Sequence, residues 1–420
     1  MATLTNWSKN YTYRAGTLHE PRSLDELRAL VAEAPRLHAL GSRHCFNDIA
    51  DSAELVSLDG LPPLMEVDAG RRTVRVGGGT RYGTLAGHLH AAGWAVHNLA
   101  SLPHISVAGA VATATHGSGD RLQNLSAAVA GLQVVTSDGS VLELTRADKD
   151  LRGAVVHLGA LGVVTEVTLD IEPTYDVRQE VSTGLPWDAA LEHLDEITAS
   201  ADSVSLFTDW RGPTIGQVWR KTRTTPAESS PAHLYGAVRA TRQVHPLDGV
   251  DPVSTTEQLG VPGAWHERLP HFRMAFTPSK GDELQSEYLV ARHDAVAALE
   301  AVRRLSDVVS PLLLVSEVRT VAADDLWLST AYQRESVAIH FTWKQIQADV
   351  EAALPRLEEA LAPFAPRPHW GKLFSASVAG APDRLREVYP RLRDFQALAE
   401  RVDPRHGFRN EFLMRHVLTR

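Results

Sequence analysis

The chain has 420 residues, of which 44% are hydrophobic and 22% charged, and its formal net charge is −9 at pH 7. This is the composition of a soluble globular protein that is long enough for two or three domains with substantial cores. The acidic balance argues against a nucleic-acid partner, which needs a basic surface. No apolar run approaches the roughly 20 residues of a membrane span.

Two further features concern the compartment and the metals that the protein uses. The N-terminal segment lacks the basic and apolar regions of a secretory signal, and the single cysteine, Cys45, cannot form an intrachain disulfide. We therefore expect a cytoplasmic protein, and we expect a monomer. His266 and His271 miss the zinc-binding HExxH spacing by one residue, and Pro270 between them breaks helices, so no metal site is predicted.

The first distinctive motif is a loop that follows a strand predicted at residues 37–40, after a helix capped by Ser23. The loop reads Gly41-Ser42-Arg43-His44-Cys45. Its successive backbone N–H groups, with Arg43 beside them, can bind a phosphate or pyrophosphate. His44 adds a nucleophilic ring nitrogen. Taken alone, such a sequence is more often an ordinary solvated turn.

A glycine cluster at residues 77–83 follows a strand predicted at residues 73–76. The dinucleotide-binding pattern G-x-G-x-x-G fails here in both possible registers. Tyr82 replaces the third glycine in one register, and Thr80 replaces the second glycine in the other. A nicotinamide dinucleotide site is therefore not predicted.

The segment from Ser101 to Gly119 is unusually rich in small residues, since twelve of its nineteen residues are Ala, Gly, Ser or Thr. Two interpretations are open. The segment forms a helix packed tightly against a sheet, or its backbone is approached closely by a large, flat molecule. In the second case the hydroxyls of Ser106, Thr113 and Thr115 and the glycine N–H groups would bind a phosphate and a ring system.

Between about residues 174 and 371, strands alternate with amphipathic helices, and polar residues recur two apart within strand-like runs. Alternation places Glu317 and Arg319 on one face of their strand, and His340 and Thr342 on one face of theirs. A single pair of this kind is more often a cross-strand pair on a solvated face. Two pairs, each flanked by bulky apolar residues, favour a sheet that lines a polar pocket.

Lys372 follows Gly371, which permits a close approach of the chain, although a lysine considered alone is more often solvated. Together with the two pairs, Lys372 would give the pocket donors and acceptors for a linear polyol, because each hydroxyl both donates and accepts. Buried polar groups would also reject a substrate that lacks a hydroxyl.

In this order, these stretches resemble the vanillyl-alcohol-oxidase-type flavoproteins, and within them the alditol oxidase (xylitol oxidase) branch, next to the aldonolactone oxidases. The resemblance covers essentially the whole chain, including residues 161–165 and the ending at residues 403–412. It implies an α+β fold. A two-part FAD-binding domain of the vanillyl-alcohol-oxidase (PCMH) type would comprise residues 1–173 and the C-terminal segment 372–420, and an α+β substrate-binding cap would comprise residues 174–371.

The resemblance also implies that FAD is joined covalently to His44, and a neutral imidazole is a reasonable nucleophile for that bond. Cys45 is expected to be a packed thiol that faces away from the flavin ring. The cofactor-binding residues carried over are Gly41, Ser42, Arg43, His44, Cys45, Ser101, His104, Ser106, Gly109, Thr113, Thr115, His116, Gly117, Gly162, Val164 and Asn410.

The activity implied is oxidation of the terminal hydroxyl of alditols such as xylitol and sorbitol to the aldose, by hydride transfer to flavin N5, with O₂ reduced to H₂O₂. The substrate-binding residues carried over are Ser101, Glu317, Arg319, His340, Thr342 and Lys372. Arg319 and Lys372 would stabilise the developing alkoxide, Glu317 would hold a neighbouring hydroxyl, and either His340 or Lys372 would accept the proton.

Two other functions remain as alternatives. One is an aldonolactone oxidase or dehydrogenase of the same superfamily. The other, from a different class, is a non-catalytic sugar-binding protein with a decayed flavin site.

Overall fold

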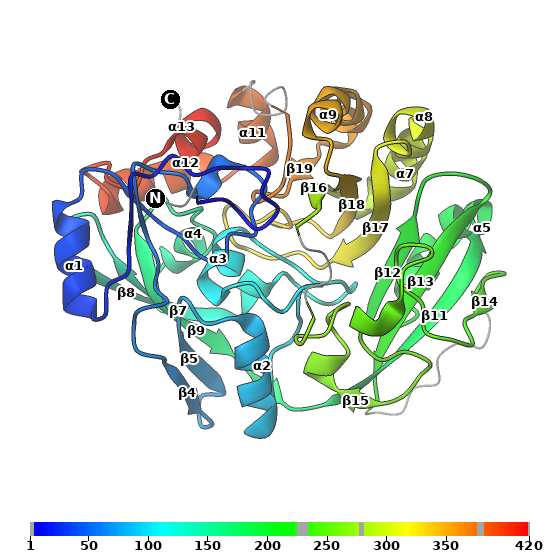
Figure 1. Ribbon diagram of the computed structural model, residues 1–420, viewed down its shortest axis with the longest axis horizontal. Helices are drawn as coiled ribbons and strands as arrows, with labels where there is room; N and C mark the ends of the chain where they lie inside the picture. Colours follow the sequence, from blue (N-terminus) through cyan, green and yellow to red (C-terminus); the bar gives the residue numbers. More distant parts are fainter. Residues whose placement is uncertain (1–3, 225–233, 277–280, 376–381, 419–420) are drawn as a thin grey trace.

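The computed structural model describes residues 4–224, 234–276, 281–375 and 382–418 (Figure 1). Their strands form a three-stranded, a five-stranded and a nine-stranded sheet, together with a short pair of strands, β6 (Trp94–Ala95) and β10 (Glu172–Pro173). The fold is therefore mixed α and β, as the sequence predicts. Within the described residues, no helix has the length and apolar character needed to cross a membrane.

The three-stranded sheet is parallel and carries the first motif at its end. Its order is β1-β3-β2, with β1 at Thr17–His19, β3 at Glu54–Val56 and β2 at Leu37–Ala39. Helix α1 (Leu24–Glu33) begins at the predicted cap Ser23, whose hydroxyl accepts the Glu26 amide at 3.2 Å. The chain then leaves β2 directly into the loop at residues 41–45.

The five-stranded sheet is antiparallel, in the order β4-β5-β9-β7-β8. Its strands are β4 (Met65–Asp68), β5 (Thr73–Gly77), β9 (Val163–Asp170), β7 (Val129–Val135) and β8 (Val141–Thr145), and the helices of this region are α2 (Tyr82–Ala91), α3 (Val107–Ala112) and α4 (Leu151–Ala154). The small-residue segment thus contains only one short helix, α3.

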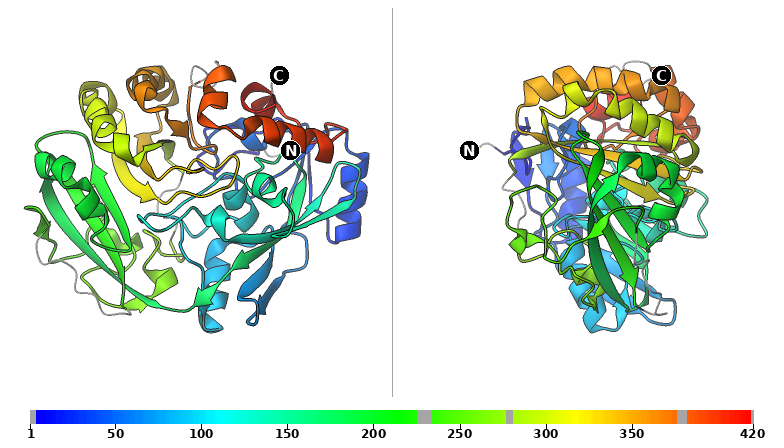
Figure 2. Two further views of the ribbon diagram at one scale, coloured as in Figure 1. Left: turned by 180° about the vertical axis from the view of Figure 1, so that it is seen from behind. Right: turned by 90° about the vertical axis from the view of Figure 1, so that its right-hand side faces the viewer.

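The C-terminal helices return to this part of the chain, as Figures 1 and 2 show by their red colour beside the blue N-terminal region. They are α11 (Pro382–Val388), α12 (Leu392–Val402) and α13 (Glu411–His416). Phe395 and Phe412 share one hydrophobic core with Leu151 of α4 and Leu169 of β9. The tail and the N-terminal part are therefore held together by a common core.

The nine-stranded sheet follows the order β14-β11-β13-β12-β17-β18-β16-β19, and β15 pairs with β11. Its strands are β14 (Val238–Arg239), β11 (Asp176–Pro186), β13 (Thr214–Arg223), β12 (Ser203–Thr208), β17 (Leu313–Val321), β18 (Ser336–Lys344), β16 (Glu283–Ala291), β19 (Arg367–Pro368) and β15 (Gly263–Ala264). The helices of this region are α5 (Trp187–Glu192), α6 (Leu194–Thr198), α7 (Ala295–Arg303), α8 (Ser306–Val309) and α9 (Gln347–Leu361).

Alternation along β18 separates the two faces of this sheet. Ile339 and Phe341 belong to a hydrophobic core that includes Leu299 of α7 and Leu354 of α9. His340 and Thr342, which alternate with them along the strand, line a cavity on the other face. The predicted strands around both polar pairs are confirmed as β17 and β18. The predicted domain boundaries at residues 173 and 371 stay a prediction.

Candidate active site

A large cavity lies against the polar face of β16, β17 and β18, and its empty volume is about 2130 Å³ with the open solvent at its mouth included. Its other walls come from the loop at residues 38–46, the segment at residues 100–116 and residues 369–372. All predicted cofactor- and substrate-binding residues line this cavity except His104, Gly117 and Asn410. Residues predicted from distant parts of the sequence are thus brought to one place.

The three exceptions make contacts outside the cavity lining. His104 Nε2 lies 3.0 Å from the Met274 carbonyl oxygen. A Cβ added to Gly117 would lie 2.4 Å from Asn98 Oδ1, so this glycine is needed for close packing. Asn410 caps α13 and donates to the Ile49 carbonyl at 2.8 Å. For these residues the contacts favour a supporting role over direct contact with a ligand.

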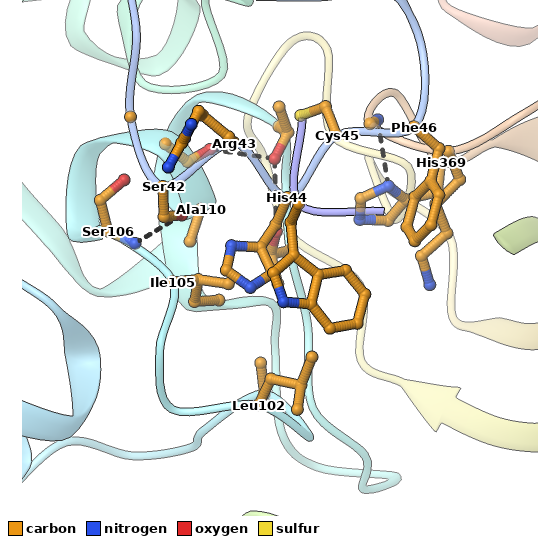
Figure 3. Close-up of a pocket in the computed structure, with 18 of the residues that line it drawn as sticks. Ser42, Arg43, His44, Cys45, Phe46, Leu102, Ile105, Ser106, Ala110 and His369 are labelled. Carbon is orange, nitrogen blue, oxygen red and sulfur yellow. Dashed lines mark hydrogen bonds between the residues drawn. The ribbon is translucent and has the colours of Figure 1, made fainter. Parts of the chain in front are cut away.

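His44 lines the cavity (Figure 3). The Trp7 ring stacks on its imidazole at a centroid distance of 5.2 Å. Its Nδ1 is buried and has no hydrogen-bond partner among the described residues. Burial lowers the pKa of His44 to about 4, and the neighbouring His104 and Arg81 add to this effect. The imidazole is therefore neutral at pH 7 and keeps a nucleophilic lone pair.

The Cys45 side chain points away from the His44 ring (Figure 3). A Cβ added to Gly371 would lie 3.0 Å from Cys45 Sγ, so the sulfur packs closely against that glycine. Burial raises the pKa of the thiol to about 12, which makes it a poor nucleophile. These contacts support the interpretation of Cys45 as a packed thiol.

The cavity wall next to His44 contains backbone segments that lie very close to one another. Only glycine, which has no Cβ, permits this close approach. A Cβ added to Gly41 would lie 2.7 Å from Ser106 Oγ, and a Cβ added to Gly78 would lie 2.2 Å from the Val164 carbonyl oxygen. The hydroxyl oxygen of Ser106 is buried without a partner among the described residues. A smooth backbone wall with an unused hydroxyl and an unused imidazole nitrogen fits a flat, phosphate-bearing cofactor such as FAD.

Among the residues that line the cavity, Glu287 of β16 joins several predicted site residues. Its carboxylate lies 2.7 Å from Arg319 Nη2, 2.7 Å from Lys372 Nζ and 3.3 Å from His116 Nε2. Its side chain is fully buried. Burial alone would raise the pKa of Glu287, but the positive charges of Lys372 and Arg319 and the neighbouring His116 hold it well below its usual value. Glu287 therefore stays ionised and fixes both cations.

Glu317 of β17 forms a second anionic centre in the same cavity. Its Oε1 accepts a hydrogen bond from His271 Nε2 at 2.8 Å and lies 3.6 Å from Arg319 Nε. Burial opposes ionisation, yet Arg319 and His271 outweigh it and lower the pKa of Glu317. Both carboxylates are therefore ionised, and each lies beside a cation.

The two candidate proton acceptors are held in different environments. Burial and the nearby Lys372 charge hold the pKa of His340 well below its usual value, so its ring is neutral at pH 7. His340 Nε2 lies 3.1 Å from Gln285 Oε1. We assign a hydrogen on Nε2, donated to this amide oxygen, which leaves Nδ1 as the acceptor of the ring. Lys372 instead donates to Glu287, although burial lowers its pKa.

Several lining residues were not predicted from the sequence. Gln285 and Glu287 of β16 recur two apart, and the same alternation argument used for β17 and β18 would have found them. His271 ends a stretch that resembles a zinc motif but lacks its spacing, and nothing else in that stretch indicates a site. Trp7 carries no pattern that links it to His44, because their contact joins segments that are apart in the sequence.

Comparison with protein families gives two matches. Residues 17–145 match the FAD binding domain family, and residues 279–416 match the D-arabinono-1,4-lactone oxidase family. Among curated relatives, an alditol oxidase of Streptomyces sp. (strain IKD472 / FERM P-14339) is 50% identical over 419 residues, which are 98% of each chain. An L-gulono-1,4-lactone dehydrogenase of Mycobacterium tuberculosis is 30% identical over 98% of each chain.

Solved structures give the same fold at much lower sequence identity. The crystal structure of a cholesterol oxidase from Brevibacterium sterolicum has a TM-score of 0.78 with this chain. The match covers 99% of this chain and 96% of that chain, with 14% sequence identity. At this identity the likeness establishes the fold alone.

Proposed function

Because the chain belongs to the alditol oxidase branch of the vanillyl-alcohol-oxidase-type FAD flavoproteins, we propose that it oxidises alditols with FAD as its cofactor. The terminal hydroxyl of a polyol such as xylitol becomes the aldehyde of an aldose, and O₂ is reduced to H₂O₂. One observation carries this proposal: the glycine-lined wall beside His44 and the polar face of β16–β18 belong to a single cavity.

The residues that would hold FAD line the first part of the cavity. The loop at residues 41–45 and the segment at residues 106–116 offer backbone N–H groups and small side chains along its length. When bound there, FAD supplies the hydride acceptor at N5 and the route of the electrons to O₂. The neutral, buried His44 with its unused Nδ1 supports a covalent bond to the cofactor at this residue.

The polar end of the cavity would bind the substrate. Arg319 and Lys372 donate hydrogen bonds toward the hydroxyl that reacts and stabilise its negative charge as the proton leaves. Glu287 keeps these two side chains together at 2.7 Å from its own oxygens. Glu317 and Thr342 would bind the other hydroxyls, and Arg319 Nη1 contacts the Ser101 hydroxyl at 3.3 Å.

We assign the role of proton acceptor to His340. Its neutral ring has an acceptor at Nδ1 once Nε2–H donates to Gln285. Lys372 is a donor in its contact with Glu287 and would have to leave that carboxylate in order to accept a proton. The ion pair thus favours His340 over Lys372 for this step.

The proposal is tested by comparing substrates. The purified protein is mixed in air with xylitol, sorbitol or a five-carbon aldonolactone. Each mixture is then assayed for peroxide. We expect peroxide with the alditols and little with the lactone. Activity with the lactone alone would instead assign the chain to the aldonolactone oxidases. A colourless protein from flavin-rich expression would favour the sugar-binding alternative.

A further inference from the structure

A lysine is buried behind the substrate end of the cavity, at a place where a charge is costly. Lys221 lies in β13, and only 1% of its surface is exposed. Its Nζ contacts the carbonyl oxygens of Leu269 and of Pro270, the latter at 3.2 Å. The third contact is to His271 Nδ1 at 3.0 Å. Moving an ammonium group out of water is unfavourable unless its environment compensates.

These three contacts determine where the protons lie. The two carbonyl oxygens accept two of the ammonium hydrogens, and the third is directed at His271 Nδ1. A neutral imidazole that accepts at Nδ1 carries its own hydrogen on Nε2. That hydrogen faces Glu317 Oε1 at 2.8 Å. Lys221 and His271 therefore form a relay of two hydrogen bonds that ends on the Glu317 carboxylate.

The His271 ring has little freedom to turn away from this arrangement. The rings of Phe207 and Trp219 lie edge-on to it at centroid distances of 5.5 and 5.4 Å. Its backbone N–H also donates to the Ser101 carbonyl oxygen at 3.1 Å. One residue thus supports two predicted substrate-binding residues that come from different elements.

Only one oxygen of Glu317 is used by the protein. Oε1 accepts from His271, whereas Oε2 has no hydrogen-bond partner in the part of the chain that the structure describes. Glu317 also lines the cavity. A carboxylate that is fixed through one oxygen and lines the cavity can present the other oxygen to a hydroxyl of the substrate in one defined position.

The charged groups around Glu317 also support an ionised carboxylate at this position. Glu317 and Glu287 lie beside Arg319 and Lys372. Burial lowers the pKa of Lys221 to about 7, and the charge of Glu317 acts against this shift. Other titratable groups near Glu317 are His271 and His340, and burial keeps both neutral by lowering their pKa values. The charges of Lys221 and Glu317 therefore stabilise each other.

We propose that Lys221 and His271 are positioning residues that orient the Glu317 carboxylate for one hydroxyl of the polyol. This inference rests on the proposed function, because it deepens the account of the same pocket. The relay acts through Glu317 and touches no substrate. It predicts that Lys221 and His271 contribute to substrate affinity and register only while Glu317 is present.

The test is a double-mutant cycle on the flavin-loaded enzyme. Anaerobic mixing with xylitol gives the limiting rate of flavin bleaching and the half-saturating xylitol concentration for Lys221→Met, Glu317→Gln and the double variant. We expect Lys221→Met to raise the half-saturating concentration by about tenfold or more, since hydrogen bonds to charged groups have this strength. In the Glu317→Gln background the same substitution should change it by less than about twofold.

A matched control is available on the same strand. Arg220 is also buried, but it points to the opposite face of β13, where its Nη2 lies 3.7 Å from Glu180. Arg220→Met removes a buried cation and should lower the melting temperature without changing the half-saturating xylitol concentration. It separates loss of stability from loss of positioning.

His271 provides a second arm that does not depend on how Lys221→Met folds. His271→Gln keeps an N–H donor near the position of Nε2 and should retain most of the xylitol affinity, whereas His271→Phe should lose it. The acid limb of the pH profile should move to higher pH in His271→Phe, because Glu317 loses a donor that favours its ionised form. A change in packing alone would not produce this shift.

Two outcomes would overturn the proposal. One is an unchanged xylitol affinity in both Lys221→Met and His271→Phe. The other is a double variant whose half-saturating xylitol concentration rises by the full product of the two single effects. A wild type that is bleached by a lactone and by no alditol would refute the proposed function instead. The same cycle run with that lactone would then still decide whether the relay acts through Glu317.

Discussion

His44 is the residue that we propose forms a covalent bond to FAD. Replacing His44 with Ala should abolish acid-stable attachment of flavin, because the imidazole that we propose bonds to the cofactor is lost. The measurement is acid precipitation followed by absorbance of pellet and supernatant, and we expect all flavin in the supernatant. Cys45→Ser is the control and should keep its flavin in the pellet. Flavin that remains in the pellet of His44→Ala would refute the assignment.

The environment of His44 also predicts how attachment depends on pH. Only the neutral imidazole is nucleophilic, and burial lowers the pKa of His44 to about 4. The neutral form therefore dominates above that pH, and the rate of attachment should be nearly constant from about pH 5 to 8. The rate is measured by adding FAD to protein expressed without flavin. A rate that falls below pH 6.5, where an ordinary imidazole is protonated, would contradict the assigned environment.

His340 and Lys372 can be distinguished by their pH profiles for flavin bleaching. The pKa of His340 is held well below its usual value, so the wild-type rate should be flat from about pH 6 to 9 with respect to this group. His340→Gln should lower the rate by about 100-fold or more at pH 7 and make it rise with pH, as hydroxide replaces the base. If Lys372→Met shows that profile and His340→Gln does not, the base is Lys372.

At the level of elements, the close approach of the turn after β5 to strand β9 forms one wall of the cavity. Gly78→Ala should destabilise the protein by about 1–3 kcal/mol, because the added Cβ would lie 2.2 Å from the Val164 carbonyl oxygen. Gly87→Ala in α2 is the control. Nothing lies within 4 Å of its added Cβ, so this substitution should stabilise the protein by about 0.5–1 kcal/mol. Urea unfolding measures the stability of both variants. Equal stabilities would contradict the close approach of Gly78 to β9.

Much of the element structure could be predicted from the sequence. Alternation identified β17 and β18 and the side on which Glu317 and His340 lie, because a two-residue period fixes the faces of a strand. The same period in β16 could have identified Glu287 as well. Lys221 could not be predicted, because an isolated lysine in a strand has no sequence signal that separates burial from exposure.

The whole molecule brings these elements together around one cavity, and this arrangement could be anticipated only through the resemblance to known flavoproteins. No local pattern shows that the loop at residues 41–45 faces β16–β18 across a common space. Likewise, no pattern in the tail predicts that Phe412 joins the same hydrophobic core as Leu169. Contacts between segments that are remote in sequence depend on the complete fold.

The central claim is that one cavity both holds the flavin and oxidises an alditol. The most direct test mixes the purified yellow protein with xylitol without oxygen, follows the visible flavin band, and then admits air and assays peroxide. We expect bleaching, followed by recovery of the band and formation of peroxide. A band that xylitol and sorbitol leave unchanged, but that a five-carbon lactone bleaches, would contradict it.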